Sequence, residues 1–215
     1  MRRSEIAIPL PRGDALGGTL VVPEEARGVI AFAHGSGSSR NSPRNNAVAA
    51  TLNEAGFATL LMDLLTGDEE EAERLTRHLR FDIELLAERL GIAIEHLDAT
   101  LAVPIGLFGA STGAAAALVA AAREPARVRA VVSRGGRPDL AGDALHSVQA
   151  PTLLIVGDLD TVVIDLNEEA RRRMKAPVEM RLIRGATHLF EEPGALGEVA
   201  TLARAWFEDH LSSGS

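Results

Sequence analysis

The sequence of 215 residues predicts an α/β fold, in which a mostly parallel β-sheet is flanked by helices within one domain. Two observations lead to this prediction. Short apolar runs alternate along the chain with segments whose apolar residues have helical spacing. In addition, no segment repeats at a fixed period and no low-complexity linker divides the chain. We expect one domain over residues 1–211, followed by a disordered tail or cloning remnant at residues 212–215.

Three kinds of segment have the character of β-strands. Residues 6–10 and 18–22 flank Arg12, Gly13 and Asp14 in the pattern of an antiparallel hairpin. The segment 178–183 alternates apolar and polar residues, which suits a strand near the edge of a sheet. Continuous apolar runs predict buried strands at 29–33, 58–62, 105–108, 128–132 and 152–156.

Helical spacing fills the gaps between these strands. The predicted helices cover residues 45–55, 69–97, 112–123, 167–174 and 196–210. Gly56 is a stop signal for the first of them. The second is long and charged, and we expect Gly91 to bend or divide it. Strands that alternate with helices imply right-handed crossovers and therefore parallel neighbours in the sheet.

Composition narrows the classes of function. The sequence has no cysteine, which excludes disulfides, thiolate metal sites and cysteine nucleophiles. A net charge of −8 and an aromatic content of 3% argue against a general affinity for nucleic acid or anionic membranes. No apolar stretch approaches the length of a membrane span, and prolines and charges after Arg2 and Arg3 interrupt any export signal. We expect a cytoplasmic protein, a monomer or homodimer, with no nucleic-acid or membrane partner.

The segment Gly109-Ala110-Ser111-Thr112-Gly113 joins the strand at 105–108 directly to an alanine-rich helix. A Gly-x-Ser-x-Gly pattern between a strand and a helix is typical of a nucleophile elbow, a sharp turn that exposes the serine hydroxyl above the sheet. The helix N-terminus also places partial positive charge where an oxyanion would form. We therefore predict that Ser111 is a catalytic nucleophile. Helix N-capping is the alternative role for a serine at this position.

A serine nucleophile needs a general base within hydrogen-bond reach of its hydroxyl. Of the six histidines, His188 follows the predicted strand at 178–183 and precedes the last helix, which places it at the same sheet edge as Ser111. Most of the others lie in charged helical stretches or in a loop with no strand before it, and His34 is expected to support a glycine-rich loop. We predict His188 as the base, and a structural loop histidine is the alternative.

The residue that orients this base should follow the strand at 152–156. Asp158 and Asp160 both do so, and turn formation is an alternative role for each. Asp160 lies one step deeper into the loop and is the preferred candidate. It would hold one tautomer of the His188 imidazole and stabilise the imidazolium form, without taking the proton itself.

A tetrahedral oxyanion needs two donors fixed in place before it forms. The backbone amide of Thr112 is predicted to be one of them. The glycine-rich loop after the strand at 29–33 is predicted to supply the other, from Ser36 or alternatively from Gly37. The same loop does not fit a phosphate-binding motif, because it lacks the Gly-Lys-Ser/Thr of a Walker loop and has Arg40 where a dinucleotide fingerprint needs its third glycine.

These motifs together resemble the dienelactone-hydrolase-like branch of the α/β-hydrolase superfamily. The segments that carry the resemblance are 34–37, 109–113, 151–157 with Asp160, and 185–188, and the likeness extends over about residues 29–211. It implies a single-domain α/β-hydrolase fold and the triad order Ser111, Asp160, His188. The short connection between residues 132 and 152 leaves little or no room for a cap domain.

Two details refine this resemblance. Residues 133–139 resemble a narrower subgroup, some of whose members are fused to phosphoribosyltransferase domains. The founding dienelactone hydrolases use a cysteine nucleophile, which this chain cannot supply. A serine carboxylesterase is therefore expected in preference to an enzyme that opens dienelactone.

The expected reaction is cleavage of a small-molecule ester through an acyl-enzyme on Ser111, without a cofactor or metal. Arg40 and Arg134 follow predicted strand ends on the catalytic side and are candidates to bind a carboxylate or phosphate of the substrate. Salt bridges that stabilise loops are the alternative role for both. Two alternative functions remain: an acyltransferase or thioesterase with the same triad, and a non-catalytic small-molecule-binding protein on the same scaffold.

Overall fold

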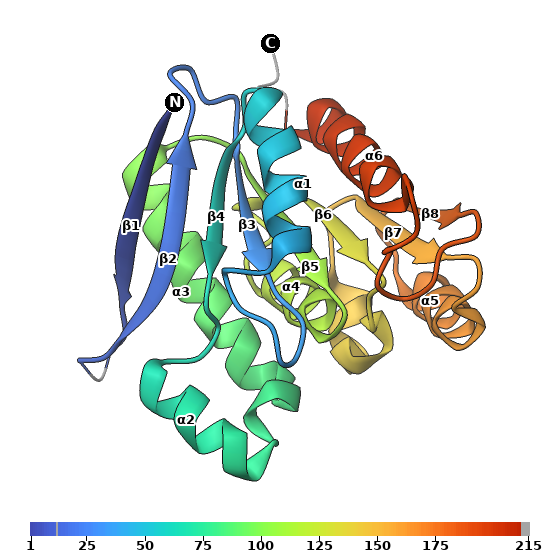
Figure 1. Cartoon of the computed structure of the whole chain (residues 1–215), viewed down its shortest axis with the longest axis horizontal. Coiled ribbons are helices and arrows are strands. Elements are labelled where there is room, and N and C mark those ends of the chain that lie inside the picture. Colours follow the sequence, from blue (N-terminus) through green and yellow to red (C-terminus); the bar gives the residue numbers. More distant parts are fainter. Residues whose placement is uncertain (12, 212–215) are drawn as a thin grey trace.

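A computed structural model describes residues 1–11 and 13–211, so the predicted tail at 212–215 lies outside the described residues. Within the described part, an eight-stranded sheet crosses the molecule in the order β1-β2-β4-β3-β5-β6-β7-β8 (Figure 1). The strands are β1 (Arg2–Pro9), β2 (Ala15–Val22), β3 (Val29–Ala33), β4 (Ala58–Met62), β5 (Ile105–Ala110), β6 (Val128–Arg134), β7 (Thr152–Gly157) and β8 (Val178–Ile183).

The pairing of the strands confirms the predicted mostly parallel sheet. From β4 to β8 every neighbouring pair is parallel. The hairpin of β1 and β2 is antiparallel, and β2 joins β4 in antiparallel register. Strands β3, β4, β5 and β7 are buried along their whole length, as expected for strands that are covered on both faces, whereas β8 at the edge is partly exposed.

Helices cover both faces of the sheet (Figure 1). They are α1 (Pro43–Glu54), α2 (Gly67–Thr76), α3 (Ile83–Leu101), α4 (Thr112–Arg123), α5 (Thr161–Arg173) and α6 (Ala195–His210). Helices α1 and α6 pack on one face, and α3 and α4 pack on the other. Among the described residues, no helix combines the length and the apolar character needed to cross a bilayer.

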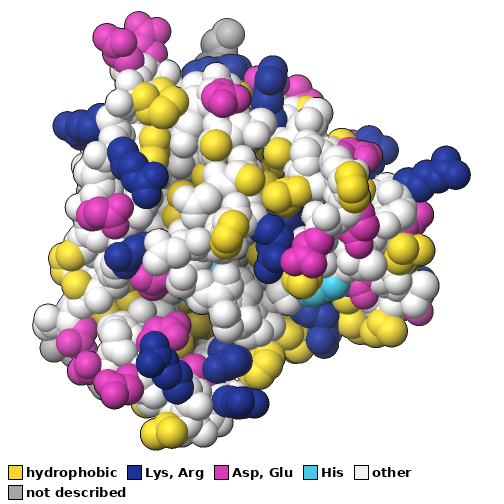
Figure 2. Space-filling model, viewed as in Figure 1, with side chains coloured by type: hydrophobic (Ala, Val, Ile, Leu, Met, Phe, Trp, Pro, Cys, Tyr) yellow, Lys and Arg dark blue, Asp and Glu magenta, His cyan; other side chains and the backbone are white. Residues whose placement is uncertain are grey.

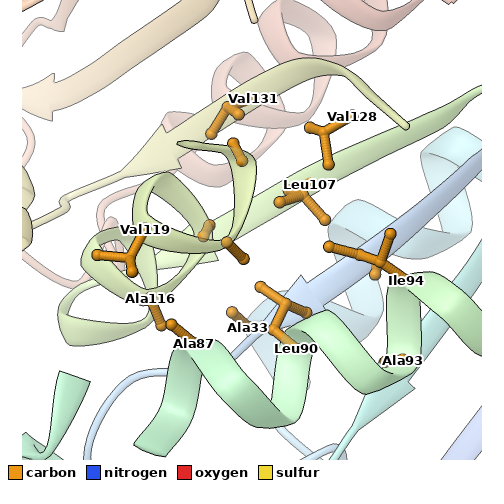
Figure 3. Close-up of a cluster of buried hydrophobic side chains, with 14 of the residues drawn as sticks. Ala33, Ala87, Leu90, Ala93, Ile94, Leu107, Ala116, Val119, Val128 and Val131 are labelled. Carbon is orange, nitrogen blue, oxygen red and sulfur yellow. The ribbon is translucent and has the colours of Figure 1, made fainter. Parts of the chain in front are cut away.

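The core between α3, α4 and the sheet is built from small and branched aliphatic side chains. Leu90 and Ile94 of α3 lie against the sheet, close to Leu107 of β5, and Ala116 of α4 lies on the same side (Figure 3). All residues from Thr112 to Ala121 of α4 are buried, which the run of alanines makes possible because it allows close approach of the helix to the sheet.

The predicted division of the long helix at Gly91 is wrong. Helix α3 runs through Gly91, and the break lies between α2 and α3 instead. Helix α2 ends at Thr76, and the next residue, Arg77, has a left-handed backbone with φ 56°. Helix α3 begins after Asp82, whose carboxylate accepts a hydrogen bond of 3.0 Å from the backbone N–H of Leu85. A side-chain cap of this kind contributes about 1 kcal/mol, comparable with the cost of one glycine inside a helix.

On the outer surface, Figure 2 shows basic and acidic side chains interspersed over the face that is seen in Figure 1. No broad area of one charge sign covers that face.

Candidate active site

Ser111 lies between the end of β5 and the start of α4 in a strained backbone conformation, with φ 51° and ψ −123°. For a residue other than glycine, such a conformation costs about 1–3 kcal/mol and persists only where the surroundings hold it. Here the backbone N–H of Ser111 donates to the carbonyl of Arg134 at 3.2 Å, and its carbonyl accepts from the N–H groups of Ala114 and Arg137, both at 3.1 Å. The Ser111 side chain makes no capping hydrogen bond to α4, so N-capping does not account for this residue.

Two glycines make this turn possible. A Cβ at Gly113 would lie 2.2 Å from the carbonyl oxygen of Ala33, and a Cβ at Gly109 would lie 2.4 Å from the Cα atom of Ala114. Both neighbours are backbone atoms that cannot move away independently. The glycines of the Gly-x-Ser-x-Gly pattern are therefore required by close packing between β3, β5 and α4.

The side chains of Asp160 and His188 are in direct contact. Nδ1 of His188 lies 2.7 Å from Oδ2 of Asp160, and because a carboxylate only accepts, the imidazole donates through Nδ1. Asp160 immediately precedes α5, which begins six residues earlier than the sequence pattern indicated. Asp158, the alternative candidate, instead accepts a hydrogen bond of 2.6 Å from the backbone N–H of Gly185.

Ser111 and His188 line the same cavity, whose volume is about 220 Å³. The three predicted loops thus meet at the carboxyl ends of the parallel strands. Among the hydrogen bonds of the described residues, none joins the Ser111 hydroxyl to His188. Hydrogen bonds between a nucleophile and its base are commonly long in the absence of substrate. The side chain of His188 is 39% exposed and that of Asp160 is 17% exposed, so the imidazole is accessible from the cavity.

The structure differs from the prediction at one of the two expected oxyanion donors. Ser36 lines the cavity, but its backbone N–H donates to the side-chain hydroxyl of Thr112 at 2.9 Å. The Thr112 hydroxyl is within reach because Thr112 is buried beside the loop after β3. Gly37, the alternative, has a left-handed φ of 73° and does not line this cavity. The backbone N–H of Thr112 has no partner among the described hydrogen bonds.

His34 stabilises the loop after β3 through two hydrogen bonds of its imidazole. Its Nδ1 donates to the carbonyl of Gly35 at 2.9 Å, and its Nε2 accepts from the backbone N–H of Leu64 at 3.2 Å. Burial disfavours the charged imidazolium and lowers the pKa of His34, although the Gly35 carbonyl opposes that shift. His34 is thus a neutral structural residue, as expected from the sequence.

The structure gives Arg40 contacts of its alternative role, salt bridges that stabilise a loop. Its backbone N–H and its Nη1 contact the carboxylate of Asp63 at 2.8 and 2.6 Å, and its Nε lies 3.7 Å from Glu5. Arg40 does not line the cavity that contains Ser111. Two acidic residues that are distant along the chain neutralise its charge. The sequence pattern could not reveal these contacts, and therefore it did not distinguish the role of Arg40 from that of Arg134.

Arg134, the other predicted substrate-binding arginine, does line the cavity. Only 7% of the residue is exposed. Its Nη2 lies 3.4 Å from the side-chain oxygen of Asn45, and its guanidinium lies 5.8 Å from the ring centre of Phe190. Burial and the nearby positive charge of Arg44 lower the pKa of Arg134 to about 10, so it stays charged at neutral pH. Asn45 and Phe190 belong to no recognisable motif, so no signal in the sequence indicated their place beside Arg134.

Comparison with known proteins agrees with this fold. The chain matches the Dienelactone hydrolase family over residues 16–212. A crystal structure of dienelactone hydrolase from Anabaena variabilis has a TM-score of 0.95 and 54% sequence identity, and the match covers 98% of each chain. Est1E from Butyrivibrio proteoclasticus has a TM-score of 0.81 with 18% identity over 97% of this chain and 99% of that one, a likeness of fold alone.

A curated protein from Mycobacterium tuberculosis is 57% identical over 210 residues and is provisionally named a phosphoribosyl transferase. The match covers 96% of this chain but 45% of that protein. The chain therefore spans less than half the length of this curated relative.

Proposed function

Because the chain belongs to the dienelactone hydrolase family, we propose that it is a serine hydrolase that cleaves carboxylic esters through an acyl-enzyme on Ser111. The observation that carries this proposal is the contact of 2.7 Å between Asp160 and His188, together with the cavity that His188 and Ser111 both line. The strained φ of 51° at Ser111 supports the same role, since strain of this kind gathers at functional sites.

The first half of the proposed reaction forms the acyl-enzyme. The Ser111 oxygen attacks the carbonyl carbon of the ester while Nε2 of His188 takes the hydroxyl proton. Asp160 accepts from Nδ1 and stabilises the imidazolium that results. The N–H of Thr112 and the N-terminus of α4 stabilise the oxyanion. The ester C–O bond then breaks, and the leaving alcohol takes the proton from His188.

The second half releases the acid. A water molecule gives a proton to His188 and attacks the carbonyl carbon of the acyl-enzyme. The bond between that carbon and the Ser111 oxygen breaks, and Ser111 recovers its proton from His188. An acyltransferase or thioesterase would use the same residues with a different acceptor or leaving group. The mycobacterial relative is named for a transferase activity. We propose that this activity belongs to the part of that protein that lies outside the match.

A fluorophosphonate probe tests this proposal because it reacts with an activated serine. We expect mass spectrometry to find one adduct on Ser111, none in Ser111→Ala, and at least a hundredfold slower labelling in His188→Ala. His146→Ala is the matched control, because His146 is exposed and lies outside the cavity, and it should label at the wild-type rate. Absence of an adduct on Ser111, or equal labelling in His188→Ala, would favour a non-catalytic binding protein.

A further inference from the structure

Five of the residues that line the cavity carry hydrogen-bond donors or positive charge, and none of them is acidic. They are Ser38 and Ser42 from the loop before α1, Arg44 and Asn45 from the first turn of α1, and Arg134 from the end of β6. We call these five residues the cationic wall. No aspartate or glutamate lines this cavity among the described residues. The N-terminus of α1 adds partial positive charge on the same side.

The guanidinium of Arg134 is buried without a counter-ion. No salt bridge of the described residues includes Arg134, and its Nε atom is buried without a hydrogen-bond partner. Other arginines with well-covered side chains pair with carboxylates: Arg89 with Glu69 at 2.8 Å and Arg40 with Asp63 at 2.6 Å. Burial of an uncompensated charge is expensive, so an unpaired arginine in a cavity wall indicates a site for an anionic ligand.

The position of Arg134 relates this charge to the reacting bond. Arg134 pairs with Ala110 across β5 and β6, and its carbonyl accepts the N–H of Ser111. The side chains of Arg134 and Ser111 line the same cavity, so an anion held by Arg134 would share that cavity with the nucleophile. The cavity of about 220 Å³ is smaller than most ligand pockets, which favours a compact substrate.

The arrangement of the donors favours a phosphate group over a carboxylate. The cavity is lined by Ser38 and Ser42 of a loop, by Arg44 and Asn45 of a helix terminus and by Arg134 of a strand end, so hydroxyl, amide and guanidinium donors come from three different elements. A carboxylate presents two oxygens in one plane, whereas a phosphate monoester presents three around a tetrahedral centre and carries nearly two charges at neutral pH. Arg44 also contacts Glu191 at 3.0 Å, but that carboxylate is 65% exposed and the pair is correspondingly weak.

We propose that the cationic wall binds a phosphate group of the substrate, with Arg134 as its principal ligand, so that the preferred substrate is a small phosphate-bearing ester. The assignment of the preferred substrate rests on the proposed ester hydrolysis, whereas the assignment of phosphate binding does not. Binding of phosphate to the cationic wall does not depend on turnover, and it can be measured separately.

The binding experiment uses the full chain carrying Ser111→Ala, which prevents turnover, and phenyl phosphate as the probe. We expect saturable binding by calorimetry, weakened at least tenfold when Arg134→Gln is added and at least threefold with Arg44→Gln. Arg137→Gln is the matched control, since Arg137 pairs with Asp139 outside the cavity, and it should leave the affinity unchanged. Arg44 is partly exposed, so its variant decides the question if Arg134→Gln does not fold.

The kinetic experiment compares a neutral aryl acetate with the same ester carrying a phosphate or a carboxylate on the ring. We expect wild-type kcat/KM to be more than tenfold higher for the phosphate ester than for the neutral one, and Arg134→Gln to bring this ratio close to one. Failure of phenyl phosphate to bind, or equal losses in Arg134→Gln and Arg137→Gln, would overturn the proposal. An equal preference for the carboxylate ester would overturn the assignment to phosphate. If no ester is cleaved while phenyl phosphate binds through Arg134, the hydrolase proposal fails and the anion site stands.

Discussion

Asp158 holds the loop that carries His188, because its carboxylate accepts a hydrogen bond of 2.6 Å from the backbone N–H of Gly185. Asp160 contacts the imidazole of His188 itself, at 2.7 Å. Two aspartates in one short loop thus have different partners in the next loop along the sheet edge. One positions a backbone, and the other positions a side chain.

Replacement of these two aspartates separates their roles. Asp160→Asn should lower kcat for a neutral aryl ester by about 10⁴-fold, because the amide no longer favours the required tautomer or stabilises the imidazolium. Asp158→Asn should lower kcat by about tenfold or less, since the asparagine side-chain oxygen still accepts from Gly185. Steady-state kinetics of both variants check this prediction. A loss in Asp158→Asn as large as that in Asp160→Asn would reverse the assignment.

The strain at Ser111 predicts an unusual order of stability. Ser111→Ala and Ser111→Gly should both be inactive, but the glycine variant should have the higher free energy of unfolding, by about 1 kcal/mol. Glycine adopts φ 51° without the cost of a Cβ, and this gain exceeds the entropy that glycine adds to the unfolded chain. Urea unfolding of the two variants provides the measurement. Equal or greater stability of Ser111→Ala would show that the elbow is not strained.

The close packing at Gly113 predicts a large effect of a single methyl group. Gly113→Ala should lower the free energy of unfolding by about 3 kcal/mol or more, because the new Cβ would lie 2.2 Å from the carbonyl oxygen of Ala33. Gly91→Ala is the control: Gly91 lies inside α3, and a Cβ there would meet nothing within 4 Å. It should raise the free energy of unfolding by about 0.5–1 kcal/mol. Thermal and urea unfolding distinguish these opposite signs.

The buried His34 predicts a loss of stability in acid. Its pKa in the folded protein is lowered by desolvation, although Asp63 and Glu70 oppose the shift. Between the unfolded pKa of about 6.5 and the lower folded pKa, the unfolded chain binds a proton that the folded chain does not. The contribution of neutral His34 is therefore fully present above pH 6.5 and is lost as the pH falls.

The variant His34→Gln isolates this contribution, because glutamine does not titrate. Between pH 7.5 and 5.5 the free energy of unfolding should fall more steeply for the wild type than for His34→Gln. The comparison concerns the slope with pH, so it holds even though the variant loses hydrogen bonds at every pH. Parallel slopes in urea titrations at several pH values would contradict the prediction.

The sequence was sufficient to predict the sheet because buried parallel strands have a strong local signature. The apolar runs at 29–33 and 58–62 coincide with β3 and β4, since each run ends where the chain leaves the core. The turn around Ser111 was also indicated by the sequence, because its glycines lie where a Cβ would meet neighbouring backbone atoms.

Other features depend on partners that are distant along the chain. The contact between Arg40 and Asp63, and the bond from the Ser36 amide to the Thr112 hydroxyl, arise only once the loops have been brought together. The boundary between α2 and α3 was misplaced because the capping carboxylate of Asp82 lies within a charged run that resembles continuous helix. Local patterns therefore located the elements, and tertiary contacts decided which polar groups remained free to act.

The burial of residues Thr112 to Ala121 of α4 places the two proposed reacting side chains in different surroundings. Ser111 directly precedes this buried helix, and we expect buried elements of this kind to open less often than exposed ones. His188 is attached to a partly exposed loop at the periphery. We therefore expect the loop that carries His188, and not α4, to adjust to acyl groups of different size. Substitutions that adapt the chain to a new ester should occur in that loop, while the residues of α4 stay unchanged.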